Sequence, residues 1–88
     1  MLTAELRDEC KRVFSELKRI DVADMVGRVN SASKSYAELK SDVRGVFSEL
    51  ERDGLIRRTK DAGSFIGRYK ALGKSEEYIK DFIPYELI

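Results

Sequence analysis

The sequence predicts a small α+β domain that is mostly α-helical, and three observations support this expectation. The chain has 88 residues, a length that suits one hydrophobic core. Apolar residues recur at steps of three and four along three segments before residue 53, which is the periodicity of amphipathic helices. After Gly54 the pattern changes to short apolar and β-branched runs separated by turn residues, which is typical of strands. We therefore expect three helices, a two-stranded β-hairpin and a short C-terminal helix.

The first two helices are expected at about residues 3–19 and 22–29. Thr3 and Asp21 stand at their starts, where a side-chain oxygen can accept a hydrogen bond from a backbone N–H group of the first turn. The positions expected to face the core are Leu6, Cys10, Val13, Leu17 and Ile20 in the first helix, and Val22, Met25, Val26 and Val29 in the second.

The third helix is expected at about residues 35–52, and its end is marked by Gly54. A helix commonly ends through a residue in the left-handed conformation, which glycine adopts at little cost. Gly45 lowers helix propensity in the interior and is interpreted as a point of close approach to another helix. The apolar positions of this helix are Tyr36, Leu39, Val43, Val46, Phe47 and Leu50.

The hairpin is expected from a strand at residues 55–59, a turn at 60–63 and a second strand at 64–72. In that second strand Phe65 and Tyr69 would share one face, with Arg68 and Lys70 on the other. Ser75 is the expected N-cap of the last helix, which stops before Pro84 because proline cannot continue a helix.

The composition argues against catalysis, metal binding and membrane insertion. The chain has no His and one Cys, so the commonest general base and zinc ligand is absent and no multi-cysteine metal site can form. Cys10 lies on an apolar stripe and is interpreted as a packing residue. No apolar run approaches the roughly 20 residues of a membrane span, and the N-terminus lacks the apolar region of a secretory signal. We expect a cytoplasmic protein that is not an enzyme, has no cofactor and contacts no membrane.

The net charge of +1 is a cancellation between segments. Residues 51–74 contain seven basic and three acidic residues, whereas residues 75–88 contain one basic and four acidic residues. A basic segment within a neutral chain is typical of a surface that binds a polyanion, but a solvated surface has the same composition. Charge alone leaves both interpretations open.

The segment Val46-Phe47-Ser48-Glu49-Leu50-Glu51-Arg52-Asp53-Gly54-Leu55-Ile56-Arg57-Arg58 resembles a pattern from winged helix-turn-helix regulators. In MarR-like families the pattern Leu-Glu-x-x-Gly-Leu-Ile-x-Arg joins the recognition helix to the wing. Three helices followed by a two-stranded hairpin is also the element order of a winged helix. The resemblance implies a winged-helix domain at residues 1–74, followed by a C-terminal helix and tail at residues 75–88.

The resemblance implies that the protein binds double-stranded DNA and regulates transcription. The third helix would enter the major groove, and the hairpin would contact the phosphate backbone. The expected contacts are Lys34, Ser35, Lys40, Ser41 and Arg44 from the helix, and Arg57, Arg58, Lys60, Ser64, Arg68 and Lys70 from the hairpin. The near-zero net charge keeps a second function open, a winged-helix module that binds protein instead of DNA.

The tail concentrates large apolar residues, and two interpretations of it remain open. They either cover the domain's own surface or form a homodimer interface. The residues concerned are Tyr78, Ile79, Phe82, Ile83 and Tyr85.

Overall fold

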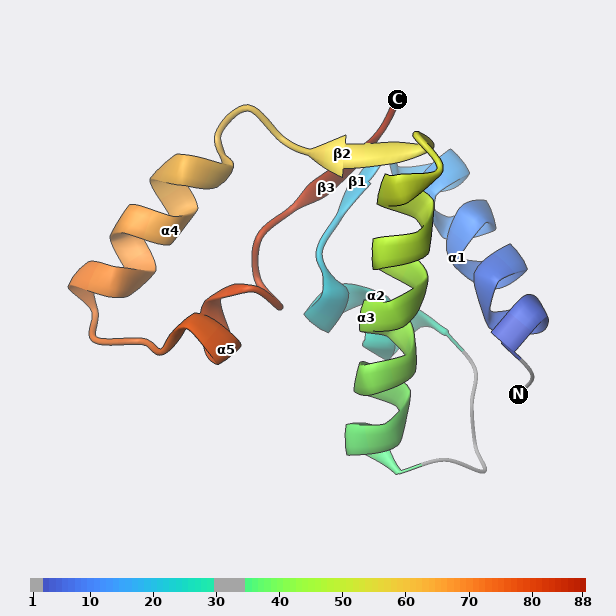
Figure 1. Ribbon diagram of the computed structural model, residues 1–88, viewed down its shortest axis with the longest axis horizontal. Coiled ribbons are helices and arrows are strands. Elements are labelled where there is room, and N and C mark those ends of the chain that lie inside the picture. The colour runs from blue at the N-terminus through green and yellow to red at the C-terminus, as the bar shows by residue number, and fades with distance from the viewer. Residues whose placement is uncertain (1–2, 30–34) are drawn as a thin grey trace.

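The computed structural model describes residues 3–29 and 35–88, and this part of the chain is mostly helical with one small sheet (Figure 1). The α+β class expected from the sequence is therefore confirmed. In chain order the elements are α1 (Thr3–Leu17), β1 (Arg19–Ile20), α2 (Val22–Arg28), α3 (Tyr36–Arg52), β2 (Ile56–Arg58), α4 (Ala62–Ala71), α5 (Glu76–Ile79) and β3 (Tyr85–Leu87).

Helices α1, α2 and α3 enclose the main hydrophobic core, as their apolar periodicity predicts. Phe14 of α1 meets Phe47 of α3 with ring centroids 5.2 Å apart. Leu17 and Tyr36 were expected in this core, but both are exposed, because each lies at a helix end beyond the reach of the neighbouring helices. The buried members are Leu6, Cys10, Val13, Phe14, Ile20, Val22, Met25, Val26, Val29, Leu39, Val43, Val46, Phe47, Leu50 and Ile56.

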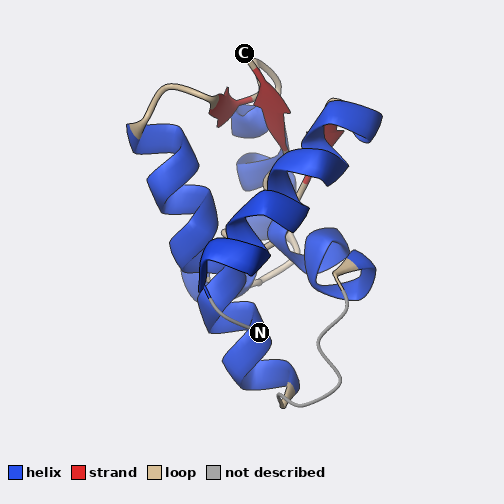
Figure 2. Ribbon diagram, turned by 90° about the vertical axis from the view of Figure 1, so that its right-hand side faces the viewer, coloured by secondary structure: helices blue, strands red, loops and turns tan. Residues whose placement is uncertain are grey.

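The sheet is antiparallel with strand order β1-β3-β2, so the strand nearest the C-terminus is its centre. Tyr85 pairs with Ile20 on one side and with Arg58 on the other. Its ring packs edge-on against Phe47, at a centroid distance of 5.4 Å. Figure 2 shows the strands gathered at one end of the helices. The tail thus completes the sheet of the same domain.

The hairpin expected at residues 55–72 is wrong, because its second half is helix α4 and β2 pairs with β3 instead. Phe65 and Tyr69 are four residues apart, a spacing that places side chains on one face of a helix as well as on one face of a strand. Ile66 and Tyr69 pack against Ile79 and Ile83, which come later in the chain. This apolar partner decides between the two conformations.

Helices α4 and α5, with the turns that follow them, form an arm beside the three-helix body, and we refer to residues 62–83 as the α4–α5 arm (Figure 1). It has a small core of its own, made of Ala62, Ile79 and Ile83. The rings of Tyr78 and Phe82 stack at 4.6 Å between centroids beside this core. The last helix ends at Ile79 rather than at residue 83, because turns carry the chain toward β3.

Gly45 and Gly54 differ in what they do for α3. Gly54 has a φ of 77°, and its N–H group donates to the Glu51 carbonyl at 3.1 Å, which confirms the predicted helix end. A Cβ atom at Gly45 would meet nothing within 4 Å in the described part of the chain. The close helix approach expected at Gly45 is therefore wrong, since no described neighbour faces it.

Substituting these two glycines should change stability in opposite directions. Gly45→Ala should raise the free energy of unfolding by about 1 kcal/mol, because alanine loses less backbone entropy in an open helix position. Gly54→Ala should lower it by about 1 kcal/mol, because a side chain strains the left-handed conformation. Urea denaturation of both variants checks the pair, and a shift of the same sign in both would contradict this account.

Candidate functional site

The polar residues predicted on α3 separate into three kinds of position. Ser35 is the N-cap, and its hydroxyl accepts a hydrogen bond from the Glu38 N–H group at 3.2 Å. Ser41 is exposed to solvent. Lys40 and Arg44 point to the C-terminal tail, as described below. Lys34 lies outside the described residues.

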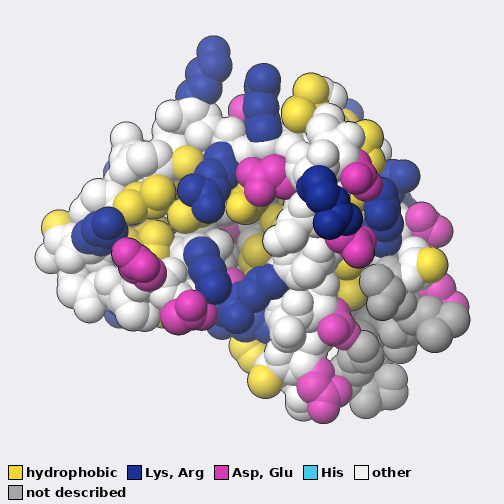
Figure 3. Space-filling model, in the orientation of Figure 1, with side chains coloured by type: hydrophobic (Ala, Val, Ile, Leu, Met, Phe, Trp, Pro, Cys, Tyr) yellow, Lys and Arg dark blue, Asp and Glu magenta, His cyan; other side chains and the backbone are white. Residues whose placement is uncertain are grey.

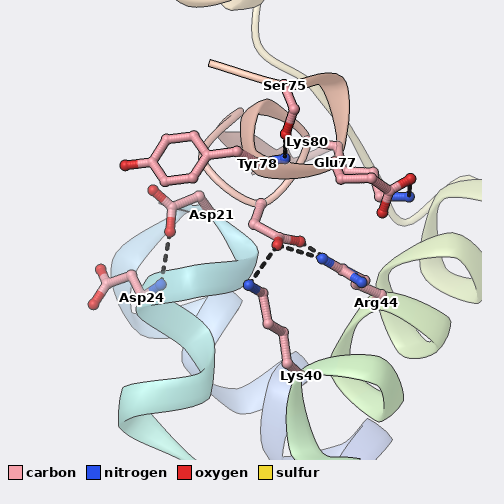
Figure 4. A network of polar contacts seen from close by, with 9 residues as sticks. Asp21, Asp24, Lys40, Arg44, Ser75, Glu77, Tyr78 and Lys80 are labelled. Atoms are coloured by element: carbon pink, nitrogen blue, oxygen red, sulfur yellow. Dashed lines mark hydrogen bonds and ion pairs between the residues drawn. The ribbon is translucent and has the colours of Figure 1, made fainter. Parts of the chain in front are cut away.

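Lys40 and Arg44 both bind the carboxylate of Asp81, which follows α5 in the chain. Arg44 Nε donates to Oδ1 at 2.6 Å, and its Nη2 donates to Oδ2 in a two-pronged ion pair. Lys40 Nζ lies 2.9 Å from Oδ2. Figure 4 shows the two basic side chains of α3 converging on this carboxylate. We refer to Lys40, Arg44 and Asp81 as the ionic clamp.

The ionic clamp joins a fully buried acid to two cations that reach solvent. Asp81 has an exposed fraction of 0 %, whereas the side chains of Lys40 and Arg44 are 27 % and 34 % exposed. Burial raises the pKa of the Asp81 carboxyl, but hydrogen bonds from Arg44 and Lys40 outweigh it and hold the pKa below its ordinary value. The carbonyl of Asp81 also accepts a hydrogen bond from the Ala23 N–H group at 3.0 Å. One residue therefore connects the tail to both α2 and α3.

The outward surface of α3 carries small polar residues with acidic residues along one side. Ser41, Gly45 and Ser48 recur at steps of four and three and are exposed. On the side toward α1, Glu49 lies 3.5 Å from Arg7, which also binds Asp53 at 2.6 Å. We refer to Ser41, Gly45 and Ser48 as the α3 ridge.

Beyond α3, the predicted basic residues lie on β2, on the following loop and around α4. Arg57 pairs with Glu86 at 3.4 Å, and Arg58 Nε lies 3.5 Å from the hydroxyl of Tyr85. Arg68 lies over the ring of Phe65, at 5.7 Å from its centroid. Lys60, Ser64 and Lys70 are exposed. These positions are close in sequence, but they belong to β2, to the following loop and to α4, and a helix directs successive side chains to different sides.

Arg19 and Asp81 are the polar residues that sequence reasoning missed. Arg19 pairs with Asp61 at 2.7 Å and lies 5.9 Å from the centroid of Phe65. Hydrogen bonds from Thr59 and then Arg19 hold the pKa of Asp61 below its ordinary value. Arg19 and Asp61 are separated by 42 residues and no local pattern connects them, so only a known contact between distant segments could have indicated them.

Two adjoining hollows lie where the α4–α5 arm meets the body. One has a volume of about 320 Å³ between α4, α5 and β2, and the other has a volume of about 230 Å³ beside α3. They share Arg58 and Lys80 in their walls. Figure 3 shows basic side chains gathered in the depression between the arm and α3.

The tail residues predicted to face a homodimer or the domain itself are mostly covered within the chain. Ile79 and Ile83 are buried in the arm's core. Tyr85 packs on the main core, and Phe82 is half-buried beside Tyr69. Tyr78 is the most exposed of the five, at 39 %.

Metal and thiol chemistry find no support in the described residues. No group of three or more His, Cys, Asp or Glu residues within 3–29 and 35–88 is placed to hold a metal ion. Cys10 is buried, and burial raises the pKa of its thiol to about 12, which keeps it protonated and unreactive at neutral pH.

None of the described helices combines the length and apolar character needed to cross a membrane.

Comparison of the chain with family models, curated proteins and solved structures finds no match in any of the three.

Removing the Asp81 charge should destabilise the protein. Asp81→Asn should lower the free energy of unfolding by about 2 kcal/mol, because the buried side chain loses charge-assisted hydrogen bonds while Lys40 and Arg44 turn toward water. Asp8→Asn on the exposed face of α1 is the matched control and should change little. Urea denaturation at neutral pH compares the two, and equal stability would contradict the role of the ionic clamp.

The ionic clamp also predicts how the stability of the protein depends on pH. Because pairing lowers the folded-state pKa of Asp81, its stabilisation is present above the ordinary value of 3.8 and is lost as pH falls through the folded-state pKa. As pH falls below 3.8, the free energy of unfolding should therefore decrease less steeply in Asp81→Asn than in the unaltered protein. Parallel acid profiles for the two would contradict the assignment.

Proposed function

We propose that the protein binds double-stranded DNA, with the α3 ridge toward the groove and basic residues of β2 and the arm on the phosphate backbone. One observation carries the proposal. Of the basic residues between 57 and 74, Arg57 alone is ion-paired with a carboxylate among the described residues, and Glu51 acts on Arg58 without forming an ion pair. The cations without such a pair are Arg58, Lys60, Arg68, Lys70 and Lys74. Cations without a carboxylate partner keep their charge available for phosphates.

The order of elements supports this proposal. Three helices followed by two antiparallel strands resembles a winged helix, and β2 and β3 are such a pair. Here the α4–α5 arm is inserted between the two strands, where a winged helix would have the tip of its hairpin. In this proposal the arm takes the place of the wing and brings its basic residues to the DNA backbone.

The proposed contacts differ from those expected from the sequence. Lys40 and Arg44 are held by Asp81, so they contribute less to the binding surface than two unpaired cations would. The α3 ridge has hydroxyl groups and no bulky side chain, which allows close approach to base edges and phosphates. Specificity would then come from the ridge, and most of the affinity from Arg58, Lys60 and Lys70.

A second candidate function is binding of a protein partner through α3. The observation that favours it is the charge on this helix: its two central cations share the carboxylate of Asp81, which leaves one positive charge there, and Glu38 and Glu49 flank the ridge. A protein with a complementary basic surface would fit such a helix better than DNA would.

Binding to a mixed-sequence duplex should depend steeply on salt and on the arm. The triple variant Arg58→Gln/Lys60→Gln/Lys70→Gln should bind roughly tenfold more weakly at low salt, because three cations no longer neutralise phosphates. The slope of log K against log salt should become less steep by about 0.9 for each phosphate that is no longer neutralised. Fluorescence anisotropy at several salt concentrations measures both quantities.

The matched control removes the same charges from another surface. Lys11→Gln/Arg12→Gln/Lys18→Gln alters α1 and the residue after it, and should weaken binding less than the arm variant at each salt concentration, because its charges lie outside the proposed surface. Absence of DNA binding by the unaltered protein at low salt would overturn the proposed function, as would equal weakening in the two triple variants.

The α3 ridge can be tested separately by adding negative charge. Ser41→Glu/Ser48→Glu should weaken DNA binding by more than about tenfold, because carboxylates facing phosphates repel them. Ser15→Glu on α1 is the control and should have a small effect. If the ridge variant binds DNA like the control, α3 is not the element that enters the groove, and the protein-binding alternative gains support.

A further inference from the structure

The larger hollow, of about 320 Å³, combines an apolar floor with a basic rim. Ile66, Ile79 and Ile83 form the apolar part, and Arg58, Lys70 and Lys80 contribute the cations. We refer to it as the arm hollow. Its volume is within the range of about 300 to 1,000 Å³ that is usual for small-molecule sites.

Two of the three cations have no carboxylate partner in the described part of the chain. Arg58 contacts the hydroxyl of Tyr85 through Nε, which leaves its terminal nitrogens available. Lys70 is exposed and belongs to no ion pair among the described residues. Lys80 differs, because its ammonium lies 3.1 Å from Glu77. The rim therefore offers two available cations, one from β2 and one from α4.

The acidic residues of the rim limit the charge of what can bind. Glu76 and Glu77 also line the hollow, so its lining has three cations and two carboxylates. Glu51, in the wall of the adjoining hollow, also acts on Arg58, so the positive excess is at most one charge. One negative charge on a ligand balances that excess, whereas a phosphate monoester with a charge of about −1.5 to −2 would exceed it. A polyanion would be repelled by the carboxylates of both glutamates.

The apolar floor requires an apolar portion in the ligand. Ile79 and Ile83 are buried in the arm's core, and Ile66 is half-buried at its edge. Most of the isoleucine surface that is still open to water belongs to Ile66, because Ile79 and Ile83 are each only 3 % exposed. Covering this surface with hydrocarbon is favourable, whereas a small hydrated anion would leave it in contact with water. An anion without an apolar body would use only the rim.

We propose that the arm hollow binds a small monocarboxylate with an apolar body, its carboxylate between Arg58 and Lys70 and its hydrocarbon on Ile66, above the buried Ile79 and Ile83. The site does not include the α3 ridge, so the inference does not rest on DNA binding. Arg58 and Lys70 are shared with the proposed backbone contacts, and a bound carboxylate would therefore compete with phosphates for them.

Octanoate is the probe, used below its micelle concentration and followed by two-dimensional amide NMR of the full chain. Saturable shifts are expected at residues 58, 66, 70, 79 and 83. Octanol has the hydrocarbon chain without the charge, and acetate has the charge without the hydrocarbon chain. Each should bind at least about tenfold more weakly than octanoate, because it makes either the apolar contact or the ionic contact but not both. Equal binding of octanol and octanoate would overturn the proposal, as would shifts confined to other surfaces or no shifts at all.

Substitutions test the position of the carboxylate. Arg58→Gln/Lys70→Gln should weaken octanoate binding by about tenfold or more, because neither charge-assisted bond can form. Arg52→Gln/Lys11→Gln removes the same charges outside the hollow and should leave octanoate affinity unchanged. Amide spectra of both variants establish that they are folded, and equal affinities in the two folded variants would overturn the assigned position.

The two proposals fail independently in these measurements. Octanoate binding to the hollow without DNA binding would leave this inference intact and remove the proposed function. DNA binding without octanoate shifts would leave the proposed function intact and remove this inference.

Discussion

The buried carboxylate of Asp81 is the constraint on which the arrangement of the C-terminal third depends. A charge without exposure to water must be paired, and Lys40 and Arg44 of α3 are the groups that pair it. The pairing holds the end of the α4–α5 arm against the body, while the Asp81 carbonyl receives the N–H group of Ala23. A few residues later the chain becomes β3, the central strand. Arm, helices and sheet are thus joined within one short segment.

The same interaction changes which basic residues are available for a partner. By charge and position on α3, Lys40 and Arg44 are natural candidates for phosphate binding, but the folded chain uses them internally. Residues 57–74 have a single acid, Asp61, and it is bound by Arg19. The unpaired positive charge is consequently found on β2 and the arm. The proposed DNA surface and the arm hollow both follow from this distribution.

Much of the three-helix body could be predicted, because its signals act within one or two helical turns. Asp21 and Ser75 accept hydrogen bonds from N–H groups three residues on, as their expected cap positions predict. Gly54 ends α3 through its own backbone conformation. The strand pairing was not predictable in the same way, because β2 and the segment after α5 are partners across an insertion of two helices.

By itself, the sequence determined the α+β class, the positions of α1, α2 and α3, the helix ends marked by caps and glycine, and the basic character of residues 51–74. The tertiary structure decided that residues 62–71 are helical, that Tyr85–Leu87 is the central strand, and that Asp81 takes two cations from α3. The physical reason is the range of the interactions. Helical periodicity and capping act between residues three or four apart, whereas Arg44 and Asp81 are 37 residues apart. Charge patterns show how many basic side chains a segment has, but only the fold shows which of them are already bound.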